Sequence, residues 1–444
     1  MRWFFATVFA CLAAASLWLL VQSKGPDGEG RIVLHWSTDD NPARRDQIAL
    51  FNRLHPGIEV RVEPSVGPEK ALLQSVSGVG ADLIDSYSIG HLQNFVSAGI
   101  AWDATEALAK RGVTKELTWP LAWSSFEIGD RLYGFPANVF APGLWYHRDL
   151  FRKAGLEPPP ESWTWDEFAA RMKQVRAKLG DHDGVYPAVG EPTTIPTALM
   201  QSNGGRLFSE DGARCVLASR ENAEALQFWQ DLMYRDRILP TPVAEAAMSS
   251  QGGWATACIA AFAERRGFVG MSGGRWWLGH LRLYRDLDLG VRPFPYRKER
   301  RMIGGARVTL INRKSAHREA ALEFLVFLAS EPYSKLVDAQ ADGFGPLRKG
   351  RVPAAGDEND RAWRRILDDA VAPSVTPRVN YATADAALRR QLEWVRNRQK
   401  SPDRALADAQ AEIDREMQLN LKAHADFVSR PKGWKFLQQD RPAK

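Results

Sequence analysis

The sequence is poor in the residues that build most catalytic and metal-binding sites. Its 444 residues include only 3 Cys and 8 His, and the histidines are scattered along the chain. A zinc site needs several Cys or His ligands at close spacing. The P-loop and His-Glu-x-x-His motifs are also absent. We therefore expect no metal and no cofactor, and the sequence assigns no catalytic residue.

The few cysteines leave one structural question open. Cys11 lies in an apolar N-terminal run, which leaves Cys215 and Cys258 as the only candidates for a disulfide. Such a bond could form in an oxidising compartment. The spacing of the two residues matches no known motif, so the sequence does not decide whether they pair.

The chain has only a small net charge and no strong excess of basic or acidic residues. Its formal net charge is +6, with 59 basic and 53 acidic residues interleaved along the sequence. A nucleic-acid-binding protein concentrates basic residues on one face, so we expect no nucleic-acid partner. The densest basic run, Arg297 to Arg301, lies between Pro-rich and Gly-rich segments. It is interpreted as a solvated loop, with contact to an anionic lipid surface or a docking partner as the alternative.

An apolar segment is present at the N-terminus. Arg2 precedes an uncharged run from Trp3 to Val21, which is about long enough to span a bilayer. Val21 to Ser23 resembles a signal-peptidase site. Residues 1–23 are therefore interpreted as a cleaved signal peptide or an uncleaved membrane anchor, and 24–30 as a tether. Either alternative places the rest of the chain in the periplasm or on the outer face of the cytoplasmic membrane.

The length and the pattern of elements predict two α/β lobes. A chain of 444 residues usually exceeds one hydrophobic core. Arg31 to Trp36 and Ile58 to Glu63 have the composition of strands, and Arg44 to Leu54 between them has helical periodicity. A strand, a helix and a strand of these lengths form a βαβ unit. We therefore predict a parallel, doubly wound sheet.

Aromatic and acidic residues follow the predicted strands. The carboxyl ends of strands face the ligand crevice in open α/β sheets. We therefore expect the side chains at and after Trp36 to lie close to those at the end of the strand from Ala81 to Asp85. The 16 Trp are an unusual number, and they suggest flat platforms for an amphipathic ligand. The residues expected to converge are Trp36, Asp39, Asp40, Asp85 and Tyr87.

The stretch from Leu144 to Phe168 has an unusually regular order. A strand ends near Tyr146, and a one-turn helix follows that Gly155 can stop, because glycine adopts the left-handed cap conformation without strain. Pro158 to Pro160 form a stiff spacer. Thr164 can then cap a helix, with Glu167 completing a capping box.

This stretch resembles the signature YNKDLF.KAGL..PP.TWDEF of extracellular solute-binding proteins of ABC importers, with His147 where Asn is usual. That class includes the maltose-binding and glycerol-phosphate-binding proteins. The similarity extends in the family's order from Arg31 to about Phe427. The other similar segments are Ile32 to Trp36, Phe51 to Val60, Ala81 to Leu83, Asn203 to Gly205, Gly270 to Trp276, Gly304-Gly305 and Lys314 to Leu325.

The resemblance implies a fold of two doubly wound α/β lobes joined by a multi-strand hinge, the class II type of periplasmic binding protein. The chain would cross between lobes near Asn138, Arg292 and Pro332. The first lobe would be 31–137 plus 292–331, and the second 138–291 plus 332–444. The resemblance further implies a monomer that binds a carbohydrate between the lobes and delivers it to the membrane permease subunits of an ABC importer.

Sequence position and resemblance together predict a ligand-binding site. Aromatic rings would stack on the sugar, polar groups would meet its hydroxyls, and glycines would let the backbone approach. Arg307 would suit a phosphate or carboxylate on the ligand; otherwise it is an outward-facing surface residue. The rings are Trp36, Tyr87, Trp276, Trp277 and Phe344; the polar groups are Asp39, Asp40, Asp85, Asn138 and Glu191; the glycines are Gly274 and Gly305.

Two other functions stay open at this point. Asp39, Asp85 and Glu191 could supply the paired carboxylates of a secreted glycan-cleaving enzyme. The chain could also be a sensing module that passes ligand occupancy to a membrane receptor. The identity of the sugar is not encoded in any motif.

Overall fold

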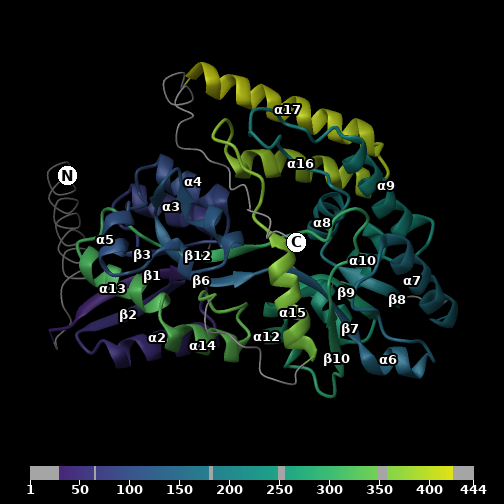
Figure 1. The fold of residues 1–444 in the computed structure, drawn as a ribbon, viewed down its shortest axis with the longest axis horizontal. Helices are drawn as coiled ribbons and strands as arrows, with labels where there is room; N and C mark the ends of the chain where they lie inside the picture. The colour runs from purple at the N-terminus through teal and green to yellow at the C-terminus, as the bar shows by residue number, and fades with distance from the viewer. Residues whose placement is uncertain (1–29, 65–66, 180–183, 249–255, 349–357, 424–444) are drawn as a thin grey trace, which may run out of the picture.

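The computed structural model describes residues 30–64, 67–179, 184–248, 256–348 and 358–423. Figure 1 shows two lobes side by side, with strands β6 (Gly134–Phe140) and β12 (Gly305–Ile311) on the side of the first lobe that faces the second. The predicted signal peptide or anchor lies outside the described residues, as does the tether up to residue 29. Within the described ranges, no helix is both long and apolar enough to cross a membrane.

The first lobe is built on a five-stranded sheet in the order β2-β1-β3-β12-β6. Strand β1 (Ile32–Thr38) pairs in parallel with β2 (Ile58–Pro64), and α2 (Pro42–Leu54) connects them, as predicted. Strand β3 (Leu83–Ser86) is also parallel to β1. The sheet is not parallel throughout, because β12 runs antiparallel to both β3 and β6. The chain reaches β12 from the second lobe, and so it crosses the sheet in the opposite direction.

The second lobe has a four-stranded sheet in the order β10-β7-β9-β8. Strands β8 and β9 are parallel, and β7 is antiparallel to β9 and β10. With helices around each sheet, the two-lobed α/β class is confirmed. The strands are β7 (Pro142–His147), β8 (Tyr186–Gly190), β9 (Gly267–Gly274) and β10 (Leu289–Arg292).

The other elements surround the two sheets or join the lobes. In the first lobe they are α3 (Pro68–Val76), α4 (Ile89–Ser97), α5 (Thr105–Lys110), η1 (Lys115–Leu117), η2 (Pro120–Ser125), β4 (Glu127–Ile128), β5 (Arg131–Leu132), α13 (Arg318–Leu328) and α14 (Glu331–Gln340). In the second lobe and at the junction they are α6 (Arg148–Lys153), α7 (Trp165–Leu179), α8 (Thr194–Ser202), α9 (Arg220–Tyr234), α10 (Pro242–Met248), α11 (Thr256–Ala263), η3 (Arg275–Trp277), α12 (Leu278–Leu281), β11 (Met302–Ile303), α15 (Glu358–Asp369), β13 (Ala370–Val371), α16 (Tyr381–Arg396) and α17 (Pro402–Ala423).

The stretch from Leu144 to Phe168 folds in the predicted order. Strand β7 leads into the short helix α6, and Gly155 has a φ of 65° after its end. The capping box before α7 is formed in both directions. The Thr164 backbone N–H donates to the Glu167 carboxylate at 2.7 Å, and the Glu167 N–H donates to the Thr164 hydroxyl at 3.3 Å.

The chain passes between the lobes at Ala141, which separates β6 from β7, and again between β10 and β12. The third crossing was expected near Pro332, which lies inside α14. Helix α14 packs against α2 of the first lobe. The chain after α14 also stays there, since Phe344 forms a bridge with Val139 of β6. By these contacts α14 and the turn after it belong with the first lobe.

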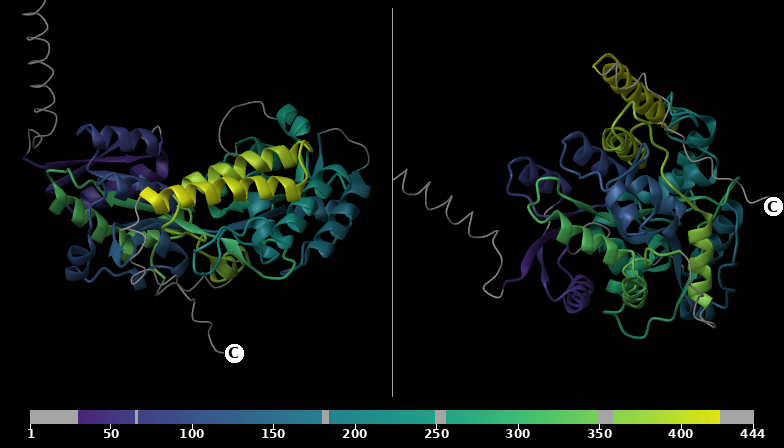
Figure 2. Two further views of the ribbon diagram at one scale, coloured as in Figure 1. Left: turned by 90° about the horizontal axis from the view of Figure 1, so that it is seen from above. Right: turned by 60° about the vertical axis from the view of Figure 1, so that its left-hand side comes forward.

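The junction of the lobes is tightly packed. Trp363 of α15 lies with its ring centroid 5.4 Å from that of Trp145 and 5.8 Å from that of Phe344. At another edge, α16 touches α4, and the Tyr381 N–H donates to the Gln93 side chain at 2.8 Å. Figure 2 shows α16 and α17 lying side by side along one face of the molecule.

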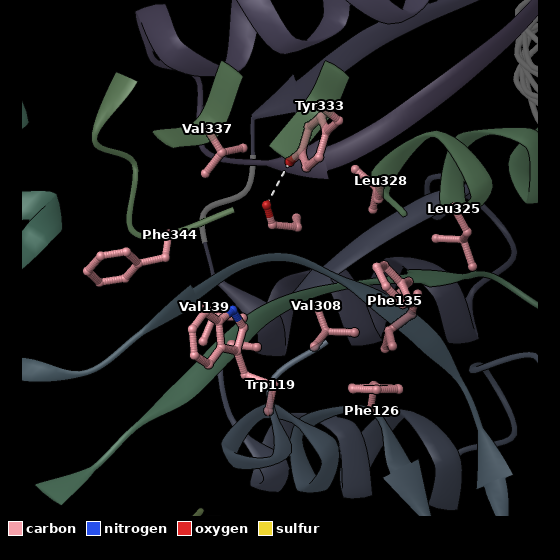
Figure 3. Packing of buried hydrophobic residues seen from close by; sticks show 14 of the residues in the cluster. Trp119, Phe126, Phe135, Val139, Val308, Leu325, Leu328, Tyr333, Val337 and Phe344 are labelled. Carbon is pink, nitrogen blue, oxygen red and sulfur yellow. Dashed lines mark hydrogen bonds between the residues drawn. The ribbon is translucent and has the colours of Figure 1, made fainter. Parts of the chain in front are cut away.

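The core of the first lobe lies on both sides of its sheet. Figure 3 shows Tyr333 and Val337 of α14 on one side of β6 and β12, with Trp119 and Phe126 on the other. The Tyr333 hydroxyl donates to the Ala137 carbonyl at 2.8 Å. In the second lobe, Cys215 is buried in the core, and both Cys215 and Cys258 are free thiols, so the disulfide left open by the sequence is not formed.

The capping box provides a test of local stability. Replacing Thr164 with Ala removes the side chain that accepts from the first turn of α7, and we expect a loss of about 1 kcal/mol in the free energy of unfolding. The measurement is the urea midpoint followed by circular dichroism. Glu167→Gln keeps a hydrogen-bonding group and is the matched control, with a smaller shift expected. A Thr164→Ala variant with an unchanged midpoint would contradict a stabilising role for the cap.

Candidate ligand-binding site

A buried carboxylate lies at the centre of the candidate site. Asp85 stands at the carboxyl end of β3, and its side chain is fully buried. The indole N–H of Trp36 donates to it at 2.9 Å. The hydroxyls of Thr38 and Thr309 donate at 2.5 and 2.8 Å. The fourth donor is the guanidinium of Arg307, at 2.8 Å. Asp85 therefore ties β1, β3 and β12 together at one end of the sheet.

The charges around Asp85 form a closed network. Arg307 also contacts Asp342 at 3.2 Å, and Arg44 lies 3.1 Å from Asp342 and 3.3 Å from Asp39. The guanidiniums of Arg44 and Arg307 are almost completely buried. Burial opposes the charge on Arg307, but Asp85 and Asp342 outweigh it and raise the Arg307 pKa. Three carboxylates surround two guanidiniums, so the cluster has one excess negative charge.

Arg307 has neither of the two roles predicted from the sequence, an anion-binding residue or an outward-facing surface residue. It is not an outward-facing surface residue, because it is 3% exposed. Its charge is also matched by Asp85 and Asp342, so no free guanidinium is offered to a phosphate or carboxylate. This arrangement gives no support to an anionic ligand at Arg307.

The sequence interpretation missed Arg44 and Asp342. Arg44 lies in the first turn of α2, directly after the crevice end of β1, and strand-end topology would have found it. Asp342 follows α14 more than two hundred residues later. No local pattern indicates that it meets Arg44, because only the packing of α14 on α2 brings the two together.

Tyr87 is the exposed ring among the predicted aromatic residues of the first lobe. Its side chain is 37% exposed, and its hydroxyl donates to Asp39 at 2.9 Å. Burial of the hydroxyl and the nearby Asp85 charge raise the Tyr87 pKa, so the phenol stays protonated. Burial works to raise the Asp39 pKa, but Arg44 and Arg307 lower it well below the ordinary range. Asp39 is thus a partly exposed, ionised acceptor beside an aromatic ring.

Trp36 does not offer an open platform. Its side chain is fully buried, with the Phe324 ring against it at 4.9 Å between centroids and the Arg44 guanidinium 5.4 Å above it. Asp40 points away from the network, since it is exposed and paired with Arg45 at 2.9 Å. These two predicted residues therefore support neither stacking nor ligand contact in this conformation.

Asn138 and Gly305 hold the backbone around the charge network in place, Asn138 by hydrogen bonds and Gly305 by close packing. The Asn138 side-chain amide donates to the Asp342 backbone carbonyl at 2.7 Å, and its oxygen accepts from the backbone N–H of Arg307 at 3.3 Å. A Cβ at Gly305 would lie 3.1 Å from the Phe140 ring. Phe344, the last predicted aromatic, is 8% exposed and packs in the core.

The second lobe contributes a smaller group around the end of β9. Trp276 is partly exposed and its ring lies over Gly274, which has no room for a Cβ there. Trp277 is fully buried and its indole N–H donates to Glu191 at 3.3 Å. Thr194 also donates to Glu191, at 3.0 Å. Burial raises the pKa of Glu191 to about 7.

The predicted residues thus form two groups, one on each lobe. Tyr87 on the first lobe and Trp276 on the second are their partly exposed aromatic residues. One connection between the lobes near these groups is Arg275, which donates to the carbonyls of Asp338 and Gly343 at 2.9 and 2.8 Å. The first group is Trp36, Asp39, Asp85, Tyr87, Asn138 and Arg307, and the second is Glu191, Gly274, Trp276 and Trp277.

Residues Gly270 to Gly274 match the Gly-x-Ser-x-Gly motif of serine hydrolases. Ser272 has a φ of 60° and is the extra residue of a bulge between β9 and β7. It is 2% exposed, and its hydroxyl donates to the Met271 carbonyl at 2.6 Å. The pattern therefore marks a β-bulge and does not present an accessible nucleophile.

No metal site is formed by the side chains that the structure describes. In residues 30–64, 67–179, 184–248, 256–348 and 358–423, no three His, Cys, Asp or Glu side chains come together as metal ligands. The carboxylates of the charge network are instead matched by arginines.

Comparison with known proteins identifies relatives across most of the chain. A sequence profile described as "Bacterial extracellular solute-binding protein" matches residues 36–335. The chain is 24% identical over 320 residues to a protein named arabinooligosaccharide-binding protein from Bacillus subtilis, covering 68% of this chain and 70% of that one. It is 28% identical over 203 residues to a protein of the same name from Halalkalibacterium halodurans, covering 44% and 43%.

Solved structures share the fold. An ABC substrate-binding protein from Listeria monocytogenes, in complex with cycloalternan, superposes with a TM-score of 0.76 at 20% identity, covering 87% of this chain and 99% of that one. The acarbose-binding receptor of Streptomyces glaucescens superposes with a TM-score of 0.74 at 18% identity, covering 87% and 98%. At these identities the likeness establishes the fold alone.

The central ion pair predicts a large stability effect. Arg307→Met keeps the volume but leaves the Asp85 carboxylate buried without its cationic partner, and we expect a loss of roughly 3 kcal/mol in the free energy of unfolding. Urea denaturation measures it. Adding Asp85→Asn should recover part of the loss, because the uncompensated charge is then removed. Equal stabilities of Arg307→Met and the wild type would contradict this role.

The environment of Glu191 predicts a pH dependence. Its pKa is raised from 4.5 to about 7 in the folded protein. Between these values the folded chain holds a proton that the unfolded chain releases. The stabilising contribution is therefore complete below about pH 4.5 and is lost as the pH rises to 7, a change of roughly 3 kcal/mol. Glu191→Gln should flatten this part of the pH–stability profile, measured by urea unfolding, and a profile identical to that of the wild type would contradict the assignment.

Proposed function

The chain belongs to the bacterial extracellular solute-binding protein family, and on this premise we propose that it captures a sugar between its two lobes for an ABC importer. The observation that carries the proposal is the pair of partly exposed rings, Tyr87 and Trp276, one on each lobe. Such rings stack on the apolar face of a sugar. The Asp39 carboxylate beside Tyr87 accepts from Tyr87, Arg44, Asn41 and Thr38, but its side chain is 45% exposed, so a sugar hydroxyl can still reach it.

The charge network favours an uncharged ligand. Both arginines are matched by carboxylates, and the cluster has one excess negative charge. A phosphate or carboxylate on the ligand would therefore meet repulsion instead of a free cation. The names of two of the similar proteins agree with this choice, because arabinooligosaccharides and cycloalternan are neutral oligosaccharides. A neutral oligosaccharide is the ligand class that we propose.

We propose that the protein binds the oligosaccharide and does not cleave it. Asp85 has its carboxylate filled by four donors, and Glu191 is 3% exposed, so neither is placed as an open acid or nucleophile. Incubation of the purified protein with oligosaccharides tests this point. Product formation that disappears in Asp85→Asn or Glu191→Gln would establish the glycan-cleaving alternative.

Export, the monomeric state and the permease partner belong to the same proposal. The family is extracellular by its description, and the apolar N-terminal run supports export, as a signal peptide or an anchor. Import and sensing differ in the partner, so co-purification with membrane proteins encoded beside this chain separates them. A permease supports import, whereas a receptor kinase or chemoreceptor supports sensing.

Trp276 provides the direct test of the site. A thermal-shift screen of the mature protein against neutral oligosaccharides, sugar phosphates and uronates should find stabilisation by a neutral oligosaccharide. Trp276→Ala removes the partly exposed ring of the second lobe. We expect it to reduce affinity for that ligand at least about fivefold, because stacking of one ring is worth on the order of 1 kcal/mol or more.

The matched control is Trp394→Ala, which removes a tryptophan that is 47% exposed on α16. It should bind like the wild type. Unchanged affinity of a folded Trp276→Ala variant, measured by isothermal titration calorimetry, would remove Trp276 from the site.

A further inference from the structure

The turn after α14 faces both lobes. Helix α14 ends at Gln340, and Ala341 has a φ of 58°, in the left-handed region that is unfavourable for a residue with a Cβ. The reversal of direction places the Asp342 carboxylate against Arg44 and Arg307 of the first lobe, at 3.1 and 3.2 Å. The turn is therefore fixed to the first lobe by buried charges.

The backbone of the same turn is held from the second lobe. Arg275 follows β9 directly, and its guanidinium donates to the carbonyls of Asp338 and Gly343 at 2.9 and 2.8 Å. Arg282, after α12, donates to the Gln340 carbonyl at 3.3 Å. The carbonyls of Asp338 and Gln340 lie in the last turn of α14, where the helix dipole adds partial negative charge, so they are favourable acceptors for a guanidinium. The Asp338 carbonyl also accepts from the Ala341 N–H at 3.2 Å.

The Arg275 side chain is also held by a contact within the second lobe. Its side chain is 12% exposed, and its guanidinium lies 4.0 Å from Asp360 of α15. The same group lies 5.2 Å from the centre of the Phe344 ring, which adds a cation–π contact with the first lobe. One side chain of the second lobe thus joins two backbone carbonyls and one ring of the first.

We propose that the arrangement of the lobes described above is the closed one and that Arg275 is an interlobe latch, which holds this arrangement before any ligand is bound. This inference rests on the proposed function, because closure around a ligand is what the latch would favour. Opening the lobes separates Arg275 from both carbonyls at once. The binding-competent closed state is therefore more populated in the ligand-free protein with Arg275 than without it.

Small-angle X-ray scattering of the ligand-free protein tests the latch without any knowledge of the ligand. Arg275→Gln should give a larger radius of gyration than the wild type, since the lobes separate. Arg235→Gln is the matched control, because Arg235 pairs with Asp231 and Asp236 within the second lobe. Its scattering should equal that of the wild type. Scattering of Arg275→Gln that also equals that of the wild type overturns the proposal.

Arg275→Lys covers the case in which Arg275→Gln fails to fold. Lysine keeps the positive charge but lacks the planar fork that reaches two carbonyls, so we expect a radius of gyration above that of the wild type. A folded lysine variant with wild-type scattering also overturns the latch. Because these measurements use no ligand, a failed latch is distinguished from a failed sugar-binding assignment.

Affinity supplies the second readout. For a neutral oligosaccharide identified by the thermal-shift screen, Arg275→Gln should raise the apparent Kd about tenfold if the closed population falls by that factor. Saturating ligand should return the scattering of the variant to the closed form. A variant that opens but binds with wild-type affinity contradicts the link between the latch and binding.

Discussion

The ion pair between Arg307 and Asp85 is the interaction on which the candidate site depends. A buried charge is tolerated only when it is paired and hydrogen-bonded, and this requirement is met by residues from β1, β3 and β12 together. The strand ends are thereby held in one arrangement. The same guanidinium reaches Asp342, which extends the network from the sheet to the turn after α14.

This turn connects the charge network of the first lobe to Arg275 of the second lobe. The Asp342 side chain is bound by Arg44 and Arg307, while the carbonyls of Asp338 and Gly343 accept from Arg275. A displacement of either lobe therefore acts on the same short segment. Since both ends of the connection are charged hydrogen bonds, the two lobes are coupled through the turn as well as through the hinge strands.

The aromatic residues show how far composition can be interpreted. The abundance of tryptophan suggested several open platforms, yet Trp36 and Trp277 are fully buried, and each donates its indole N–H to a buried carboxylate. Only Tyr87 and Trp276 of the predicted rings keep substantial exposure. A sequence indicates which rings lie near a strand end, but whether a ring is covered depends on helices such as α13, whose Phe324 closes over Trp36.

By itself, the sequence determined the elements whose causes are local. The βαβ unit at the start of the first lobe, the positive φ at Gly155 and the capping box of Thr164 follow from hydrophobic periodicity and backbone preferences within short stretches. Strand-end topology also predicted that Asp39, Asp85 and Tyr87 meet. Only the tertiary structure decided that Arg307 is buried and matched, and that α14 packs with the first lobe. It also decided that Asp342 closes the charge network. These outcomes depend on contacts between residues hundreds of positions apart, and local patterns carry no information about such pairings.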